Sequence, residues 1–186
     1  MILRGSPGGT PLTTARPRTT FGSARVLAAV VRRGDWLGVL VSERRDDRPA
    51  WVALTGRLAL FRVRTALQAS VSRRLLVLRR DGRVLVRAPV AVGRPADPTP
   101  VGRFAVTDRL LIEGASPYGC CALALSGHQP EVPQGWGGGD RLAVHGTEDP
   151  GSVGQAVSLG CLRAAPSTMR ALVDQVQLGT VLTVRP

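Results

Sequence analysis

Short apolar runs separated by turn-forming residues dominate the chain, and this pattern predicts a mainly β protein. Between residues 24 and 63, the runs VLAAVV, WLGVLV, WVAL and LALFRV alternate with stretches rich in Arg, Asp, Gly and Pro. A hairpin is predicted next, because LLVLRR and RVLVRAPVAV flank Asp81-Gly82, a pair that favours two-residue primed turns. Further strands are predicted at Arg103–Val106, Cys120–Leu125, Arg141–Val144 and Val181–Val184.

One segment near the end of the sequence has helical periodicity instead. Met169, Leu172, Val173 and Val176 recur at i, i+3, i+4 and i+7, which places them on one face of a helix. Pro166 suits the first turn and Gly179 ends the pattern. The predicted fold class is therefore mainly β, with one C-terminal helix packed on the sheet.

Apolar content divides the chain into three parts. Residues 1–23 consist largely of Gly, Pro, Thr and Arg, which predicts a disordered N-terminal tail. Residues 24–69 form a small β-rich segment whose strand spacing weakly resembles an SH3-like barrel. A support packed against the larger domain is favoured over a separate binding module for this segment. Residues 70–186 hold the hairpin, the later strands and the helix, and form the main domain.

The chain is strongly basic, with a net charge of +12 over 186 residues. Such a charge suits attraction to nucleic acid or to anionic polymers of a cell envelope. Nucleic acid is disfavoured, because only three Trp, three Phe and one Tyr are present to stack on bases, and they are scattered. All 25 basic residues are Arg, which a GC-rich coding bias also produces. No apolar run approaches the roughly 18 residues that span a bilayer, and no signal-peptide core is visible.

Three cysteines are too few for a disulfide framework. Cys120 and Cys121 are adjacent, so ring strain disfavours a bridge, and neighbouring residues of a strand point to opposite faces. The chain has none of the C-x-x-C or H-x-x-x-H pairs in which zinc ligands usually come. We therefore expect no metal site, and we expect these two residues to begin a buried strand.

The third cysteine lies in the stretch with the clearest chemistry, His145–Arg163 (HGTEDPGSVGQAVSLGCLR). His145 ends an apolar run, and the Gly- and Pro-rich loop that follows can fold back to bring Cys161 towards the imidazole. A free thiol has a pKa of about 8.5, and a histidine that takes its proton makes the sulfur a strong acyl-group nucleophile. Gly160 permits a tight turn, in which the N–H groups of Gly160 and Cys161 face a developing oxyanion.

These motifs resemble the YkuD-type catalytic domain of L,D-transpeptidases. His-Gly-Thr and Ser-x-Gly-Cys-Leu-Arg, with twelve residues between His145 and Ser158, are similar to the family's signature. Val90–Phe104 (VAVGRPADPTPVGRF) resembles its vG…pTPxGxF segment, and LGTVLTV resembles its closing strand. The resemblance covers residues 70–186. The family commonly has histidine at the position of Leu159, so the contribution of a second imidazole is absent here.

The resemblance implies an L,D-transpeptidase-like β-sandwich or barrel with a catalytic Cys161. It implies that His145 is the general base and that the backbone carbonyl of Gly146 orients its ring. For Arg163, two roles stay open: binding of a substrate carboxylate, or an internal ion pair that holds the loop. Ser158 is expected at the substrate-binding loop, chiefly to fasten it.

Tyr118 resembles the family's substrate-facing aromatic, although a surface turn residue fits its sequence context equally well. His128 lies in a polar loop and is expected to be exposed. Trp136, within the Gly-rich stretch Gln134–Gly139, is a candidate for a mobile lid.

The reaction implied by the resemblance joins peptidoglycan stem peptides. The donor tetrapeptide loses its terminal D-alanine to form a thioester with the enzyme, and the side-chain amine of an acceptor stem then forms a 3→3 cross-link. If water replaces the amine, the activity is that of an L,D-carboxypeptidase. No cofactor is required, carbapenem β-lactams are expected as covalent inhibitors, and an extracytoplasmic location at the cell wall is implied.

Two further alternatives come from different classes. A sortase-like cysteine transpeptidase also has His before Cys before Arg, but its arginine lies further along another strand, whereas Arg163 is two residues after Cys161. A non-catalytic cell-wall-binding protein of the same fold is disfavoured by the presence of both His145 and Cys161, and favoured by Leu159.

Overall fold

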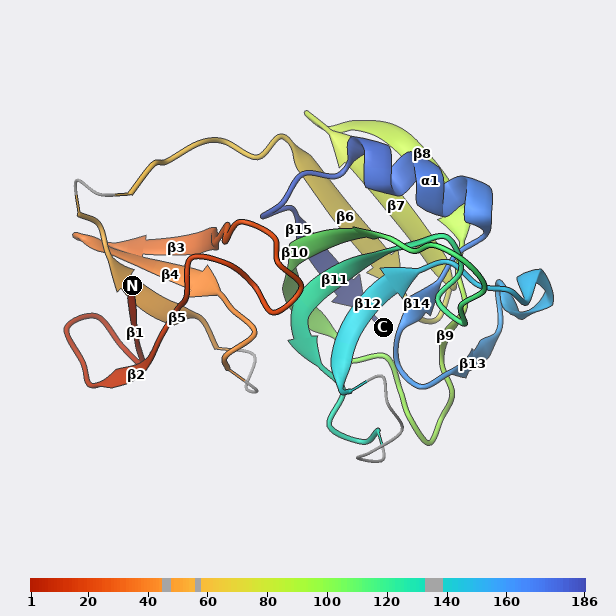
Figure 1. Ribbon diagram of the computed structural model, residues 1–186, viewed down its shortest axis with the longest axis horizontal. Coiled ribbons are helices and arrows are strands. Elements are labelled where there is room, and N and C mark those ends of the chain that lie inside the picture. The colour runs from red at the N-terminus through yellow and green to blue at the C-terminus, as the bar shows by residue number, and fades with distance from the viewer. Residues whose placement is uncertain (45–47, 56–57, 133–138) are drawn as a thin grey trace.

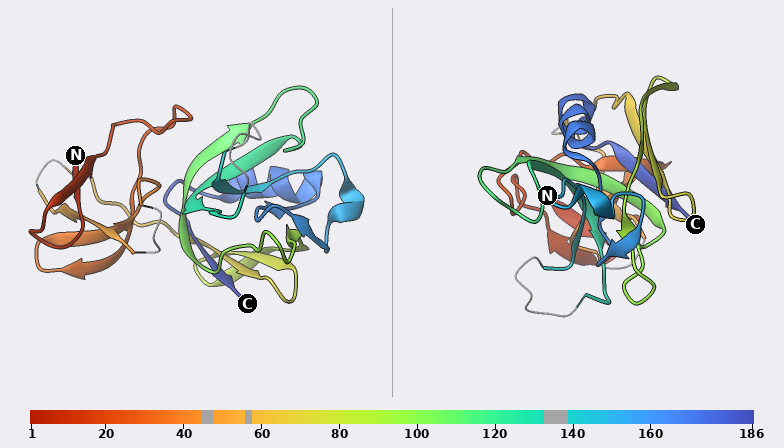
Figure 2. Two further views of the ribbon diagram at one scale, coloured as in Figure 1. Left: turned by 90° about the horizontal axis from the view of Figure 1, so that it is seen from below. Right: turned by 90° about the vertical axis from the view of Figure 1, so that its right-hand side faces the viewer.

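A computed structural model describes residues 1–44, 48–55, 58–132 and 139–186, and its strands form two main sheets (Figure 1). The first is a five-stranded antiparallel sheet with the order β2-β1-β5-β4-β3. Its strands are β1 (Ile2–Arg4), β2 (Pro11–Thr14), β3 (Ala28–Arg33), β4 (Trp36–Leu40) and β5 (Ala50–Ala53). Figure 2 shows this sheet as a lobe beside the larger one.

The larger sheet has eight strands in the order β14-β12-β11-β10-β15-β6-β7-β8. Its strands are β6 (Thr65–Ser70), β7 (Leu75–Arg80), β8 (Arg83–Pro89), β10 (Gly102–Leu111), β11 (Cys121–His128), β12 (Arg141–His145), β14 (Leu162–Arg163) and β15 (Val181–Arg185). A small parallel pair, β9 (Val92–Gly93) and β13 (Ala156–Ser158), and a 3₁₀ turn at Pro150–Ser152 lie in the connections. The helix α1 spans Pro166–Gln175.

The longest strand, β10, gives the large sheet its curl. Residues 102–105 pair with β15, residues 106–111 pair with β11, and the register shifts between Val106 and Asp108. A bulge of this kind bends a strand and increases its twist, so the two halves of β10 belong to differently oriented parts of the sheet. α1 packs against β11 and β8 and buries Met169 and Leu172 completely in the enclosed core, and Val176 just after the helix is buried there as well. The predicted mainly β fold with one C-terminal helix is confirmed.

The hairpin predicted around Asp81-Gly82 is also confirmed. β7 and β8 pair through all of β7, and the two loop residues have φ values of 48° and 83°. Two consecutive left-handed residues are what a type I′ turn requires, and its twist matches that of the flanking strands.

The sequence predicts a disordered tail over residues 1–23, but the structure places β1 and β2 there. Leu3 is 0 % exposed and packs with Val39 and Val52 in the core of the small sheet. Two strands of three and four residues are too short to produce a visible alternation, which explains the error.

The larger sheet also begins earlier than the predicted domain boundary at residue 70, because β6 starts at Thr65 and pairs with both β7 and β15.

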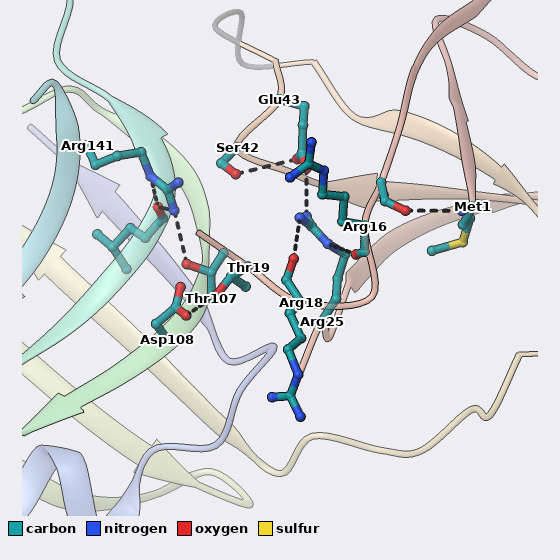
Figure 3. Close-up of polar contacts among 12 residues, drawn as sticks. Met1, Arg16, Arg18, Thr19, Arg25, Ser42, Glu43, Thr107, Asp108 and Arg141 are labelled. Atoms are coloured by element: carbon teal, nitrogen blue, oxygen red, sulfur yellow. Dashed lines mark hydrogen bonds and ion pairs between the residues drawn. The ribbon is translucent and has the colours of Figure 1, made fainter. Parts of the chain in front are cut away.

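Polar contacts connect the two sheets, as Figure 3 shows. The hydroxyl of Thr19 donates to Oδ1 of Asp108, a residue that is fully buried in β10. Within the larger sheet, Nη2 of Arg141 donates to the Thr107 hydroxyl at 3.0 Å, and the same guanidinium lies 6.0 Å from the centre of the Phe21 ring in the N-terminal segment. A small apolar cluster of Ala28, Leu40 and Ala105 adds a shared core. None of the helices in the described ranges is long and apolar enough to cross a membrane.

The contribution of α1 to stability can be tested at Leu172. Truncation of this fully buried side chain to Ala should leave a cavity and lower the free energy of unfolding by about 2–5 kcal/mol. The exposed neighbour Arg170, on the same helix, provides a matched control, and Arg170→Ala should change stability by less than about 0.5 kcal/mol. Urea denaturation measures both, and equal effects would show that the helix face is assigned incorrectly.

Candidate active site

The parallel pairing of β12 with β14 brings the two ends of the His145–Arg163 stretch together. Val144 lies opposite Leu162 and His145 opposite Arg163, and the amide of Ala164 donates to the His145 carbonyl at 2.9 Å. Cys161 immediately precedes β14, so the same pairing fixes its distance from the end of β12. Both residues line a cavity of about 80 Å³, whose other lining residues include Tyr118, Gln129, Arg141, Ser158, Leu159 and Arg163.

The His145 ring is held in one tautomer. Its Nδ1 lies 2.6 Å from the carbonyl oxygen of Gly146, and since a carbonyl only accepts, Nδ1 carries the proton. Nε2 therefore has a free lone pair. The ring is 4 % exposed and meets the Tyr118 ring edge-on, with 4.9 Å between the ring centroids. The role expected for the Gly146 carbonyl, orientation of the imidazole, agrees with this geometry.

Burial keeps both the thiol and the imidazole neutral at rest. Desolvation lowers the pKa of His145 to about 4, against the opposing effect of the Gly146 hydrogen bond, and Arg163 lowers it further. Desolvation also raises the pKa of Cys161, although the backbone of Ala143 and the charge of Arg163 act in the opposite direction. The thiol lies 3.9 Å from the Arg141 carbonyl, to which it donates. A resting thiolate–imidazolium pair is therefore disfavoured, and the arrangement suits proton transfer during attack on a substrate.

Ser158 fastens the turn that carries Cys161. Its hydroxyl donates to the Cys161 carbonyl at 2.6 Å and accepts from the Gly160 amide at 3.1 Å. Gly160 has a φ of 111°, a conformation that favours glycine, and a Cβ there would also displace the Gln129 side chain, whose Nε2 would lie 2.8 Å away. The sequence predicts the Gly160 N–H as an oxyanion donor, but this group is already bonded to Ser158. Among the described residues no acceptor takes the Cys161 N–H, which leaves it as the available donor.

Arg163 is anchored by its backbone and unpartnered at its side chain. Its amide and carbonyl bond the backbone of Ala91 at 3.1 and 2.8 Å. Nε is buried without a hydrogen-bond partner, and no ion pair to Arg163 is present in the described part of the chain. Of the two roles left open by the sequence, the internal ion pair is absent among the described residues, while a guanidinium at the cavity wall suits a substrate carboxylate.

Gln129 and Arg141 line the cavity but carried no signal in the sequence. Gln129 is 3 % exposed, and its Nε2 donates to the carbonyl of Pro98 in the Pro-rich loop after β9. Gln129 directly follows β11, and its position at the end of a predicted strand is the one signal that could have pointed to it. Trp136, the candidate for a lid, lies outside the described residues.

His128 is not exposed as expected. Its Nδ1 lies 2.8 Å from Oδ1 of Asp140, and its Nε2 lies 2.8 Å from the carbonyl of Ser42 in the N-terminal lobe. The polar composition of its loop misled the prediction, because the ring is covered by a segment far away in sequence.

The adjacent cysteines also differ from expectation. Cys121 begins β11 and is buried, but Cys120 belongs to the preceding turn, so the alternation of a strand does not apply to the pair. Their sulfurs lie 2.6 Å apart on the same side. In the described ranges, no group of three or more His, Cys, Asp or Glu side chains could hold a metal ion.

A curled, mainly β sheet with one helix and a cavity shared by a strand-end histidine and a loop cysteine has the features of an L,D-transpeptidase catalytic domain. The family model of that description, YkuD: L,D-transpeptidase catalytic domain, matches residues 64–184. The chain belongs to this family.

Similar proteins come from several bacteria. The YkuD protein of Bacillus subtilis (strain 168) is 33 % identical over 118 residues, which span 63 % of this chain and 64 % of that protein. The chain therefore covers slightly less than two thirds of this relative. An L,D-transpeptidase structure from Mycobacterium smegmatis is 25 % identical with a TM-score of 0.50, over 66 % of this chain and 59 % of that one. The catalytic domain of an E. faecium L,D-transpeptidase acylated by ertapenem has the same fold, with 21 % identity, a TM-score of 0.51, and coverage of 67 % and 99 %.

The buried imidazole predicts a specific pH dependence of stability. The pKa of His145 falls from 6.5 to about 4 on folding, so between these values the unfolded chain binds a proton that the folded protein does not. The folded state therefore loses stability as the pH falls from 6.5 to 4, by on the order of 3 kcal/mol. His145→Gln should lack this component, and urea denaturation between pH 4 and pH 7 should give it a shallower pH slope than the wild type. Equal slopes would contradict the burial of the ring.

Proposed function

We propose that the protein is a cysteine L,D-transpeptidase that acts on peptidoglycan stem peptides through a thioester at Cys161. One observation supports this above all: the carbonyl of Gly146 holds the proton of His145 on Nδ1, in a cavity that Cys161 also lines. The imidazole is thus ready to accept a proton through Nε2 from a thiol that is neutral at rest.

The first half-reaction forms the acyl-enzyme. Sγ of Cys161 attacks the carbonyl carbon of the third residue of the donor stem while its proton passes to Nε2 of His145. The backbone N–H of Cys161 stabilises the negative charge on the carbonyl oxygen. The C–N bond to the terminal D-alanine then breaks, the imidazolium protonates the departing amine, and a thioester remains.

The second half-reaction regenerates the enzyme. The side-chain amine of an acceptor stem attacks the thioester, and His145 takes the proton that the amine loses. Collapse of the tetrahedral intermediate breaks the C–S bond, returns the proton to sulfur and yields a 3→3 cross-link. Water in place of the amine gives trimming by an L,D-carboxypeptidase, so the two outcomes differ only in what reaches the thioester.

Substrate binding in this proposal depends on the cavity wall. The unpartnered guanidinium of Arg163 offers paired N–H groups to a carboxylate of the stem, and the Tyr118 ring covers one side of the imidazole. Leu159, where the family commonly has histidine, makes the wall more apolar and removes a hydrogen-bonding group. An extracytoplasmic location at the cell wall follows from the substrate.

Replacement of the nucleophile should abolish turnover without loss of the fold. With purified tetrapeptide-containing muropeptides, the wild-type protein should produce cross-linked dimers or trimmed stems that mass spectrometry can identify, and Cys161→Ala should produce neither. Cys161 lies on a loop, so its truncation removes chemistry more than packing.

Cys120→Ala serves as the matched control, because it removes a thiol outside the cavity. It should retain the wild-type product yield. Products from Cys161→Ala at the wild-type level, with an unchanged circular dichroism spectrum, would exclude the proposed nucleophile. Binding of muropeptides by the wild type without any product would favour the non-catalytic alternative.

A carbapenem such as ertapenem should acylate Cys161 and neither of the other cysteines. The strained lactam carbonyl resembles the scissile amide, and attack on it needs a base near the thiol. Burial and the contact with Cys120 raise the pKa of Cys121 to about 12, which suppresses its thiolate. Intact-protein mass spectrometry should show one adduct, and peptide mapping should place it between Ser158 and Arg163.

The same assay tests the base. His145→Ala should be acylated more slowly by a factor on the order of 10²–10⁴, the usual contribution of a general base. An adduct on the Cys120–Cys121 pair, or an unchanged rate in His145→Ala, would argue against the proposed roles.

A further inference from the structure

The outward face of the larger sheet carries arginines from several strands. The register aligns Arg103 of β10, Thr183 of β15, Gln68 of β6, Val77 of β7 and Arg87 of β8 in one row across the sheet. Residues aligned in this way share a face, and this is the face opposite to the buried Leu76 and Leu78 of β7.

A hollow on this face has a volume of about 490 Å³. We call it the basic groove, and its charged lining residues are Arg73, Arg79, Arg87 and Arg185. No Asp or Glu side chain lines it. The remaining lining residues are small, polar or aliphatic: Gln68, Ala69, Ser70, Ser72, Leu75, Val77 and Pro186.

The arginines of the groove have no acidic partner within the described ranges. Arg79 donates only to the carbonyl of Gly82, at 2.9 Å, and no side-chain bond or ion pair involves the other three. Two nearby arginines are engaged: Arg64, just before β6, pairs with Asp81, and Arg80 of β7 bonds the Gln175 side chain of α1 at 2.8 Å. Four arginines without an acidic partner around one hollow make the local electrostatic potential positive, and a bound polyanion would neutralise this charge.

We propose that the basic groove binds a linear polymer of repeating phosphodiester units that carries no bases. Neighbouring strands lie about 4.8 Å apart, so guanidinium groups on β7, β8 and β15 can each meet a different phosphate of one extended chain. Arginine suits this task, because its planar fork bonds two phosphate oxygens at once.

The lining also discriminates between kinds of polyanion. Nucleic acid without sequence preference is usually held by aromatic side chains on which bases stack, and no aromatic residue lines the groove. A membrane surface favours a face with protruding apolar side chains, whereas Leu75 and Val77 are half-buried on the floor of a hollow. The groove shares no lining residue with the cavity of His145 and Cys161, so both can be occupied together.

Binding of purified poly(glycerol phosphate) to the full chain tests the inference. We expect saturable binding, and we expect the logarithm of the binding constant to fall linearly with the logarithm of the salt concentration. The double variant Arg87→Glu/Arg185→Glu should bind roughly tenfold or more weakly, because it reverses two charges in the groove. The neutral pair Arg87→Gln/Arg185→Gln should reduce the salt slope by roughly 1.5.

The matched control is Arg83→Glu/Arg170→Glu, which changes the net charge equally. Arg83 is aligned with Arg80, whose side chain reaches α1, and Arg170 is exposed on that helix, so both lie away from the groove. This control should bind within about twofold of the wild type. All variants should react with ertapenem at the wild-type rate, which separates loss of the groove from loss of the active site.

Three results would overturn the inference. The first is an equal loss of affinity in the control variant, which would show that only net charge matters. The second is tighter binding of single-stranded DNA with the same number of phosphates. The third is binding to phosphatidylglycerol vesicles without binding to poly(glycerol phosphate).

Discussion

The candidate site depends on one short parallel pairing, that of β12 with β14. Parallel neighbours need a crossover connection, and here the crossover is the loop from Gly146 to Cys161, which contains the small strand β13. The backbone hydrogen bond from Ala164 to His145 and the two bonds between Arg163 and Ala91 fix both ends of this connection. The residues of the site are therefore placed by main-chain bonds, and side chains are left free for chemistry.

The same enclosure determines the electrostatics. Removal of water lowers the pKa of the imidazole and raises that of the thiol, so each group rests in its neutral form. A neutral pair costs little to bury, whereas a resting ion pair in the same cavity would have to offset a larger desolvation penalty. In the mechanism that we propose, charge appears only when Cys161 attacks a substrate carbonyl, and the Cys161 amide then stabilises that charge.

Patterns of neighbouring residues in the sequence correctly predicted the structural features that depend on neighbouring residues. The Asp81-Gly82 turn, the strands of the larger sheet and the helix that buries Leu172 followed from periodicity and turn chemistry, and the ordered motifs located the cavity residues His145 and Cys161. Two of the failures involve partners distant in sequence. Leu3 is ordered by the core of β4 and β5, and His128 is covered by Ser42. The Gly160 amide escaped prediction for another reason, since its bond to Ser158 depends on the exact path of the turn.

The contacts between the two lobes limit where this chain can be truncated to isolate its L,D-transpeptidase domain. The matched segment starts at residue 64, but Thr19 supplies the hydroxyl that bonds the buried Asp108, and Ser42 supplies the carbonyl that faces His128. His128 in turn contacts Asp140, the residue before the strand whose carbonyl at Arg141 faces the Cys161 thiol. A chain trimmed to residues 64–184 would take these partners away and expose the Asp108 carboxylate and the His128 imidazole to water. The N-terminal lobe thus covers one side of the catalytic domain, and its removal would increase the mobility of the first residues of β12.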